Sequence, residues 1–398
     1  MRNDEHIGAR IATWRRIRGH TQRQLAEGTN TSLSLIQKIE RGERAATGSV
    51  ISAASRYLGI DRGTLTGQPY LTRDRGENNV HASVTAIRRE LASYQMPPED
   101  EVPTPDLAAL GALTAKVSAM RHRADFDALG TALPLALQQL RHATHATSGT
   151  AREAVMAMLA EVYYAARQLT HKLGYFDLTS LLADRYGWAA GQAGNPHLQA
   201  LADVLRAGDL DSVGDCRSAR TVLRMTTSRF DLHARSSSDL SVWGWLHLMS
   251  AYMAAHAKDS AATWAHYEEA RAAAESLATD QDHYRLAFGP TNVAIWGTAL
   301  GVELMDSAQA LERAQHVHLT PSTPPERAGH HYIDLARAQL LHGRRDAALR
   351  SLLTARSITP QQVRHHPLAR DTVITLAQTE RRSTSTLRSV ANWMGIED

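Results

Sequence analysis

Residues 21–44 read TQRQLAEGTNTSLSLIQKIERGER, and this stretch decides the fold of the first part of the chain. Thr21 is a good N-cap, and Gln24 three residues later completes a capping box, so a helix is expected to begin here. Gly28 and Asn30 follow in a polar turn, where either residue can adopt a positive φ angle. The stretch therefore predicts a helix followed by a tight turn.

A second helix is expected directly after the turn. Ser32 is its N-cap, and Gly42 ends it after residue 41. Its buried stripe is predicted to be Leu35, Ile36 and Ile39. Three more helices are expected over residues 5–17, 49–58 and 61–65, the first with Ile7, Ile11, Trp14 and Ile17 on one face. Residues 1–66, called the head below, are thus predicted to form a five-helix domain.

The helix pair resembles the helix-turn-helix of the phage repressor/Cro-type superfamily, also called the xenobiotic-response-element family. The matching positions are Thr21, Gln22, Leu25, Ala26, Ser32, Ile36 and residues 39–42. The likeness covers residues 5–66. The turn departs from the family pattern, because Asn30 and Thr31 stand where the family usually has Gly followed by Val or Ile, although the Thr31 methyl group can still be buried. The resemblance implies a DNA-binding domain.

In domains of this kind the second helix of the pair lies in the major groove of DNA, with its N-terminal side chains at the base edges. The residues expected to contact bases are Leu33, Ser34, Gln37 and Lys38. The residues expected to contact phosphates are Gln22 and Ser32 at helix N-termini, and Arg41 and Arg44 just beyond the groove. Glu40 is instead expected to be structural and to pair with an arginine of the head, for which Arg10 is the candidate.

The composition is that of a globular protein with more than one domain. The chain has 398 residues, of which 43% are hydrophobic and 21% are charged, and this length suggests two or three domains. The single cysteine, Cys216, excludes a disulfide framework, a multi-cysteine zinc site and an iron–sulfur cluster. The sequence has neither the apolar core of a signal peptide at its start nor an apolar run of about 18 residues. We therefore expect a soluble, cytoplasmic protein.

Charge is distributed unevenly along the chain. Residues 1–75 carry 13 Lys and Arg against 7 Asp and Glu, whereas the rest carries 31 against 34. A basic first domain on a mildly acidic remainder is the distribution expected when only one end meets a polyanion such as DNA. Chance variation in a short segment gives the same pattern, so charge supports the helix-turn-helix prediction without deciding it.

The rest of the chain has an all-helical pattern, because apolar residues recur at three- and four-residue spacing and β-branched alternation is rare. Breaks are expected at residues 66–79, 95–105 and 320–325, the second of which contains four prolines. A helix over residues 80–94 is expected to bridge the first two breaks. The predicted division is the head (1–66), a linker with a connector helix (67–105), and a helical domain (106–398), called the body below.

The end of the body resembles a tetratricopeptide repeat, in which small residues let two helices approach closely and a proline stops the second one. The matching residues are Tyr332, Leu335, Ala336, Ala348, Leu352, Ala355 and Pro360. Further helix pairs are predicted over residues 152–195, 247–275 and 285–318. Several hairpins in series favour an α-solenoid. A compact bundle without repeats is the alternative.

The combined layout resembles a large actinobacterial class of transcription regulators with a repressor-type head, a connector helix and a degenerate tetratricopeptide body. The motifs that carry this resemblance are KLGYFDL (172–178), FGPTN (288–292), HYIDLARAQLLHGRRDAAL (331–349) and VRHHPLARD (363–371). The layout is also similar to that of the peptide-pheromone-sensing regulators of Gram-positive bacteria, in which the concave face of the solenoid binds a short peptide. These resemblances imply a homodimeric regulator whose body binds a peptide or small-molecule effector.

Effector-binding candidates come from the first helix of each pair, because first helices line the concave face of such solenoids. They are Tyr164, Arg167, His171, Trp243, His247, Asn292, Trp296, Asp334 and Arg337. Asn292 is the favoured residue, since a carboxamide can bond both a donor and an acceptor of a peptide backbone. The alternative for the aromatic residues is core packing, and for Asp334 and Arg337 it is an ion pair within one helix.

Enzyme signatures are missing from the sequence, which has no His-Glu-x-x-His, no Gly-x-Ser-x-Gly, no phosphate-binding loop and no dinucleotide fingerprint. No catalytic residue, metal or cofactor is therefore expected. Arg217 and Arg220 near Cys216 suggest a lowered thiol pKa and a redox-responsive cysteine, against the alternative of an inert one.

The predicted function is a sequence-specific transcription regulator that binds a double-stranded DNA operator as a homodimer and responds to an effector. The first alternative is a DNA-binding adaptor whose solenoid docks a partner protein without any diffusible ligand. The second alternative is the antitoxin of a toxin–antitoxin pair, which the large body disfavours.

Overall fold

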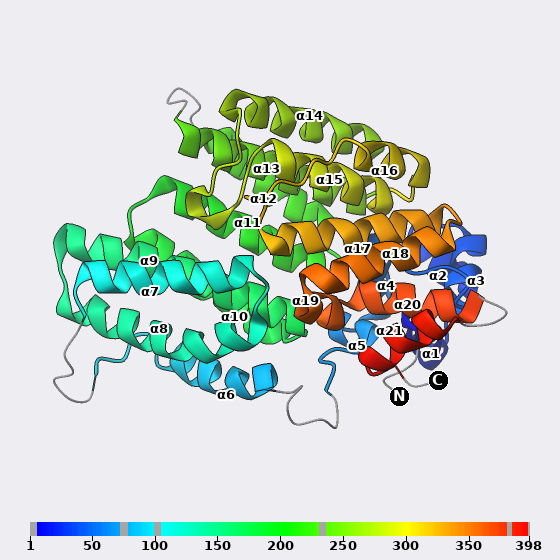
Figure 1. The fold of residues 1–398 in the computed structure, drawn as a ribbon, viewed down its shortest axis with the longest axis horizontal. Coiled ribbons are helices and arrows are strands. Elements are labelled where there is room, and N and C mark those ends of the chain that lie inside the picture. The colour runs from blue at the N-terminus through cyan, green and yellow to red at the C-terminus, as the bar shows by residue number, and fades with distance from the viewer. Residues whose placement is uncertain (1–5, 72–78, 99–104, 231–235, 380–383, 397–398) are drawn as a thin grey trace.

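The computed structural model describes residues 6–71, 79–98, 105–230, 236–379 and 384–396. Over these residues the regular structure is helical (Figure 1), apart from an isolated antiparallel bridge between Gln281 and Phe288. This arrangement confirms the predicted all-α class. None of the helices described there is both long and apolar enough to cross a lipid bilayer.

Five helices form the head, as predicted: α1 (Ile7–Ile17), α2 (Gln22–Gly28), α3 (Leu33–Glu40), α4 (Gly48–Leu58) and α5 (Arg62–Thr66). The capping box of α2 is present, because the Thr21 hydroxyl accepts from the Gln24 amide and the Gln24 side chain accepts from the Thr21 amide. Ser32 caps α3 by accepting from the Leu35 amide. In the turn between the two helices, Asn30 takes the positive φ angle, 50°.

The core of the head buries apolar side chains from all five helices, among them Ile7, Ile11, Leu25, Ile36, Ile39, Val50, Ile51, Leu58 and Leu65. The expected inward position of Ile17 is wrong, since its side chain is 62% exposed. With 3.6 residues per turn, position 17 is rotated about the axis of α1 by roughly 80° from Ile7 and roughly 120° from Ile11. It therefore lies outside the stripe that the other helices cover.

The described helices that follow the head are α6 (Asn79–Ala92), α7 (Leu107–His122), α8 (Phe126–Ala146), α9 (Gly149–Leu173), α10 (Phe176–Gln192), α11 (Pro196–Ser212), α12 (Cys216–Arg229), α13 (Ser237–His256), α14 (Ser260–Leu277), the 3-10 helix η2 (His283–Arg285), α15 (Pro290–Glu303), α16 (Ser307–Ala314), α17 (Pro325–Leu341), α18 (Arg345–Ile358), α19 (Pro360–His365), α20 (Pro367–Thr379) and α21 (Ser385–Trp393). Helices that follow one another pack together most extensively, as α9 with α10, α11 with α12, α13 with α14, α15 with α16 and α17 with α18. Gly174, at a φ angle of 88°, turns the chain between α9 and α10. Helix pairs in series are compatible with the predicted α-solenoid.

Helix α6 is the helix expected as the connector, and it also packs against the body. It packs against α8, and its apolar face, formed by Val80, Val84, Ile87 and Leu91, belongs to the main core of the body. Half of the break expected over residues 66–79 lies outside the described residues, since 72–78 are not described. Helix α6 therefore shares the main core of the body.

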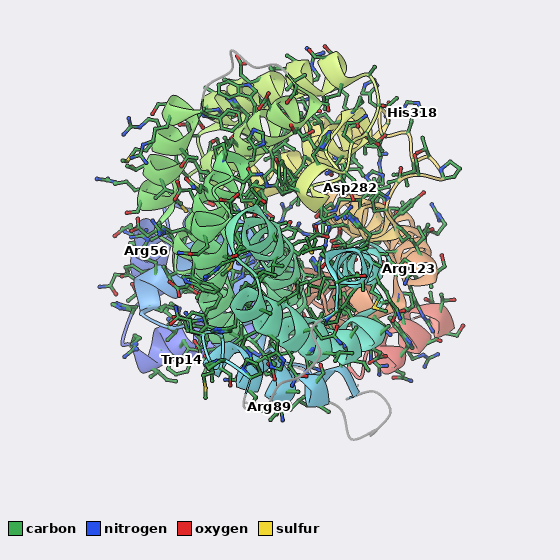
Figure 2. All side chains as sticks on the ribbon, turned by 90° about the vertical axis from the view of Figure 1, so that its left-hand side faces the viewer. Trp14, Arg56, Arg89, Arg123, Asp282 and His318 are labelled. Carbon is green, nitrogen blue, oxygen red and sulfur yellow. The ribbon has the colours of Figure 1, made fainter. Side chains whose placement is uncertain are left out.

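The head packs against the other end of the chain (Figure 1). Asp371 of α20 accepts hydrogen bonds from the backbone amides of Ile7 (2.9 Å) and Ala46 (3.1 Å), and Leu368 of the same helix is part of the core of the head. In the view turned by 90°, Trp14 and Arg56 mark the head at one edge of the molecule (Figure 2). The first and last parts of the sequence thus hold each other in place.

Candidate DNA interface and central cavity

The N-terminal part of α3 presents polar side chains to solvent. Ser32, Ser34 and Lys38 are exposed, whereas Leu33 and Gln37 are half-buried. The opposite side of the helix buries Ile36 and Ile39 in the core of the head. The predicted base-contacting residues of α3 are therefore exposed or half-buried, on the side of the helix away from the core of the head.

A buried ion pair fixes α3 to the rest of the head. Arg15 of α1 donates from Nε and Nη2 to the two carboxylate oxygens of Glu40, at 2.6 and 2.9 Å. Gln22 of α2 donates to the same carboxylate at 2.7 Å. The predicted structural role of Glu40 is confirmed, but Arg10 as its partner is wrong, because Arg10 donates to the Thr66 carbonyl at the end of α5. Glu40 therefore connects α1, α2 and α3.

The predicted phosphate contacts have different surroundings. Gln22 is half-buried and its amide is bound to Glu40. Arg41 is exposed and pairs with Glu43, also exposed, at 2.6 and 3.0 Å. Arg44 is half-buried and lines a small cleft of about 60 Å³ between the head and α17. The contacts of all three with phosphate stay predictions.

A central cavity of about 300 Å³ lies in the body beside the head. Its walls come largely from α9, α11, α13, α15 and α17, which are the first helices of the successive pairs. Six of the nine predicted effector-binding residues line it, namely Tyr164, Arg167, His171, Trp296, Asp334 and Arg337. These residues, which recur at three- and four-residue spacing, therefore lie on the faces of their helices that point into the cavity.

The other three predicted residues, Trp243, His247 and Asn292, are not among the residues that line this cavity. Trp243 and His247 pack on each other with ring centroids 4.5 Å apart, on a different face of α13 from the cavity residues Trp245 and Tyr252. Asn292 is buried and donates to the carbonyls of Leu286 (3.3 Å) and Ala287 (2.9 Å). Its carboxamide thus holds the preceding loop, and its contact with an effector stays a prediction.

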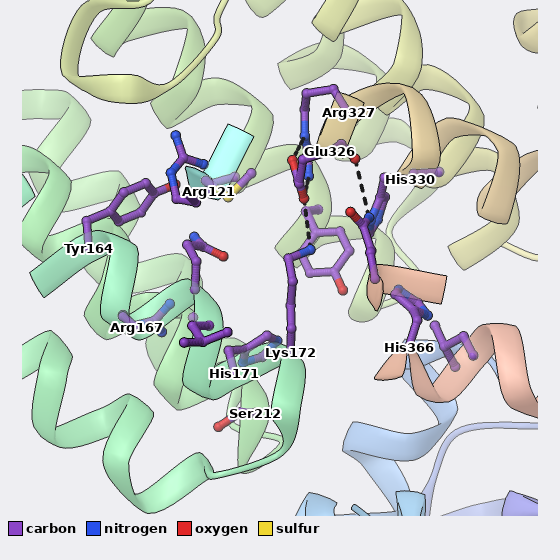
Figure 3. Close-up of a pocket in the computed structure, with 18 of the residues that line it drawn as sticks. Arg121, Tyr164, Arg167, His171, Lys172, Ser212, Glu326, Arg327, His330 and His366 are labelled. Carbon is purple, nitrogen blue, oxygen red and sulfur yellow. Dashed lines mark hydrogen bonds and ion pairs between the residues drawn. The ribbon is translucent and has the colours of Figure 1, made fainter. Parts of the chain in front are cut away.

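Charged and polar side chains from different helices surround the cavity (Figure 3). Glu326 accepts from Lys172 at 2.8 Å and from Arg327 at 2.5 and 2.6 Å. Burial would raise the pKa of Glu326, but the two cations outweigh it and hold the pKa well below its usual range. Burial lowers the pKa values of His171, His330 and His366 well below 6.5, so these rings are neutral.

Sequence reasoning missed several cavity residues. Trp245 and Tyr252 lie on α13, and Glu326, Arg327 and His330 lie on α17. The spacing of Trp245, Met249 and Tyr252 along α13 is a signal that was available in the sequence, whereas the burial of Glu326 depends on helices far apart in the chain.

The head of the chain also matches known proteins. A helix-turn-helix family model matches residues 11–65, which run from within α1 into α5. YazB of Bacillus subtilis (strain 168), described as an uncharacterized HTH-type transcriptional regulator, is 36% identical over 53 residues, which are 13% of this chain and 77% of YazB. The chain belongs to the helix-turn-helix transcriptional regulators. No solved structure matches it.

In this helix-turn-helix regulator, one buried carboxylate joins the cavity to the head. Glu303 lines the cavity and accepts from the Ser49 amide at 2.9 Å and the Gly48 amide at 3.4 Å, at the N-terminus of α4. It also pairs with Arg337 at 2.7 Å and lies 3.5 Å from His256. A carboxylate at a helix N-terminus is favoured by the free amides and the helix dipole. Arg337 also makes the expected intrahelical pair with Asp334, at 2.7 Å.

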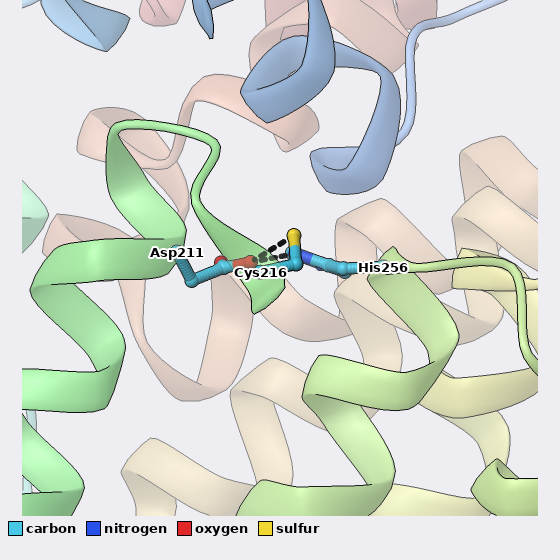
Figure 4. Close-up of side chains that lie close together, drawn as sticks. All are labelled: Asp211, Cys216 and His256. Atoms are coloured by element: carbon cyan, nitrogen blue, oxygen red, sulfur yellow. Dashed lines mark hydrogen bonds and ion pairs between the residues drawn. The ribbon is translucent and has the colours of Figure 1, made fainter. Parts of the chain in front are cut away.

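Buried His256 and Asp211 and half-buried Cys216 form a trio next to Glu303 (Figure 4). His256 Nδ1 lies 2.8 Å from Asp211 Oδ1, and Cys216 Sγ donates to the same oxygen at 3.2 Å. Burial lowers the pKa of His256, but Asp211 and Glu303 outweigh this effect and raise the pKa to about 9, so the ring is protonated at neutral pH. Donor atoms of the trio lie within 4.8 Å of one another. We interpret it as a hydrogen-bonded group, since Asp211 satisfies both neighbours.

The suggested activation of Cys216 is wrong. Burial and the Asp211 carboxylate raise the pKa of the thiol to about 12. Arg220 cannot counter this effect because it pairs with Asp259 at 2.8 Å. The surroundings of Cys216 thus disfavour the thiolate that reactive cysteines require.

Iodoacetamide should therefore label Cys216 in the folded protein at least about 100-fold more slowly than in urea at pH 8, since a pKa near 12 leaves only about one thiol in 10⁴ ionised. Mass spectrometry of timed, quenched samples measures both rates on the same cysteine. Equal rates in the folded and unfolded protein would contradict the structure around Asp211.

Proposed function

We propose that the protein is a sequence-specific DNA-binding transcription regulator that reads the major groove with α3. The observation that carries the proposal is a polar, accessible α3 face on a helix whose other side is fixed by the buried Arg15–Glu40 pair. A fixed recognition helix is what base-edge contacts need, because they depend on the position of each side chain. Membership of the helix-turn-helix transcriptional regulators supports the same function.

We further propose that the regulator acts as a homodimer on a site with two-fold symmetry. A single head of five helices offers few base contacts, and dimers double them at half-sites about one turn of DNA apart. The body, with its tetratricopeptide-like pairs, is the proposed dimerisation and sensor domain over residues 106–398. In this division residues 1–66 bind DNA, and residues 67–105 join the two parts.

The central cavity is the proposed effector site of the body. It is formed at the junction of several helices and combines aromatic with charged side chains, as ligand sites commonly do. Glu303 contacts both the cavity and α4, so occupancy of the cavity and the position of the head can be coupled. A peptide or a small molecule is the proposed effector.

Replacing Lys38 with alanine should change the sequence preference of the protein, because an exposed lysine on α3 is placed to contact a base edge. The expected loss is about 1–3 kcal/mol on the preferred base pair and less on others. Arg44→Ala should instead weaken binding to all sequences alike and lower the salt slope by about 1. Fluorescence anisotropy on a set of single-base variants of a selected duplex measures both effects.

Lys116→Ala is the matched control, since Lys116 is an exposed lysine on α7 of the body and should not affect binding. A uniform loss of affinity in both Lys38→Ala and Arg44→Ala would overturn the assignment of Lys38 to base contacts. An unchanged affinity in Lys38→Ala would remove α3 from the interface.

A further inference from the structure

The head itself supplies part of the wall of the central cavity. Arg62, the first residue of α5, and Gln68, just beyond that helix, both line it. Gln68 is held there, because its amide donates to the carbonyls of Lys172 (2.9 Å) and His365 (3.1 Å). A molecule in this cavity would therefore touch the DNA-binding head and the body at the same time.

Most charges around the cavity are already paired. Glu326 serves Lys172 and Arg327, while Arg337 lies between Glu303 and Asp334. Glu326 with its two cations carries one net positive charge, and Arg337 with its two carboxylates carries one net negative charge. His256 is protonated and cancels the charge of Asp211, its neighbour on the other side from Glu303. The local charge of these two groups is close to zero.

Two further cations have no carboxylate partner. Among the residues that the structure describes, neither Arg62 nor Arg121 forms an ion pair, although both line the cavity. Arg121 donates to the Arg285 carbonyl at 2.7 Å and lies over the ring of Tyr164 at 5.2 Å. Two arginines without a carboxylate partner in the described part of the chain thus line the cavity, one on the head and one on the body.

Three residues that line the cavity carry buried donors without an acceptor. The Nε atoms of Arg121 and Arg167 are buried and lack a partner within the described part of the chain, and both residues are only 8% exposed. The indole nitrogen of Trp296 is in the same state. Buried donors without acceptors are costly, so an acceptor supplied by a ligand would be favoured here.

Arg62 and Arg167 both line the cavity, as does His171, which follows Arg167 by about one turn on α9. After burial, the charges of Arg167 and Arg62 are the largest causes that lower the pKa of the His171 ring. Arg167 Nη2 is bound to Asp209 at 2.6 Å, which leaves its Nε for another partner. The cavity wall thus combines a cation of the head with a guanidinium of the body whose Nε lacks an acceptor.

The neighbouring wall is aromatic. Trp245 and Trp296 have ring centroids 6.0 Å apart, and Tyr252 lies 5.6 Å from Trp296, with all three lining the cavity. Flat apolar groups pack well on such rings. Together the two walls fit a molecule with an aromatic body and an acidic group.

We propose that the cavity binds a small aromatic anion, a carboxylate or a phosphate ester, whose acidic group is held by Arg62 of the head with Arg167 and Arg121 of the body. This inference rests on the proposed function and adds the chemical class of the effector and the part played by the head. Because Arg62 belongs to the DNA-binding head, the ligand favours one placement of the head on the body. DNA affinity then changes with ligand occupancy, and ligand affinity changes with DNA by the same factor.

Isothermal titration calorimetry on the full chain tests the proposal with three probes of matched shape: 2-naphthoate, 2-naphthyl phosphate and the neutral 2-naphthamide. At least one anion should bind about tenfold or more tightly than the amide, since a charge-assisted pair to a guanidinium is lost in the amide. Which anion binds better separates a carboxylate effector from a phosphate effector. Equal binding of anions and amide, or no binding of any probe, would overturn the proposal.

Arg62→Gln should abolish the preference for the anion, whereas Arg16→Gln, at an exposed arginine of the head, should retain it. An unchanged preference in Arg62→Gln would remove the head from the site. Binding of a selected DNA duplex, measured in the same samples without probe, keeps the two proposals separate. DNA binding without a preference for the anion would support the proposed DNA-binding function and contradict the proposed ligand. A preference for the anion without DNA binding would support the proposed ligand and contradict the DNA-binding function.

Discussion

Replacing Glu303 with alanine should loosen the head from the body and lower the melting temperature of the protein by about 5 °C. Glu303 is 2% exposed, and it accepts from the Ser49 amide while it pairs with Arg337. Its removal takes one negatively charged partner away from the Arg337 guanidinium and from protonated His256. It also leaves the amides of Gly48 and Ser49 in α4 without this acceptor. Breaking a buried pair on one side costs about 3–5 kcal/mol.

Hydrogen exchange followed by mass spectrometry should locate this loss at the contact between head and body. The amides of peptides that cover residues 47–52 should exchange faster in Glu303→Ala, because Gly48 and Ser49 lose their acceptor. Glu312→Ala is the control, since Glu312 is exposed on α16. Unchanged exchange in α4 together with an unchanged melting temperature would show that Glu303 does not hold the head.

The second large effect is expected from Arg15→Met. Arg15 and Glu40 have side-chain exposures of 9% and 4%, so the methionine would leave a buried carboxylate whose remaining partner is the neutral Gln22 amide. The head should lose about 3–5 kcal/mol of stability. Since Glu40 fixes α3 to α1 and α2, the affinity for DNA should fall together with the stability of the head. Urea denaturation followed by tryptophan fluorescence, with Trp14 in the head, measures the loss.

A double-mutant cycle separates the ion pair from the packing of Arg15. Arg15→Met/Glu40→Met should recover much of the lost stability, because no unpaired charge then remains buried. Arg16→Met is the matched control at an exposed position of the same helix and should have little effect. An Arg15→Met variant as stable as Arg16→Met would mean that the Arg15–Glu40 pair does not organise the head.

Local features of the head could be predicted from the sequence because they depend on neighbouring residues. Thr21 with Gln24 and Ser32 with the Leu35 amide are contacts across three positions, and both helix starts follow from them. The partner of Glu40 could not be predicted in the same way. Arg10 and Arg15 both lie on α1, and only the angle between α1 and α3 decides which of them reaches Glu40.

The cavity shows the same division between local and long-range information. Helical spacing identified residues such as Trp296 and Arg337, because the inner face of one helix is a local property. The contribution of Arg62 could not be found, since it depends on the head packing against helices near the end of the chain. The hydrogen bond from Ile7 to Asp371 is one of the contacts that create this arrangement, and periodicity contains no information about such a pair.

Selection of duplexes from a random DNA library by the purified full chain tests the claim of sequence-specific DNA recognition most directly. The proposed homodimer predicts enrichment of one motif with two related half-sites about 10 base pairs apart. Binding to this motif should weaken steeply between about 50 and 200 mM salt, as phosphate contacts require. A library without any enriched motif, or a motif bound no more tightly than a scrambled duplex at the same salt concentration, would contradict it.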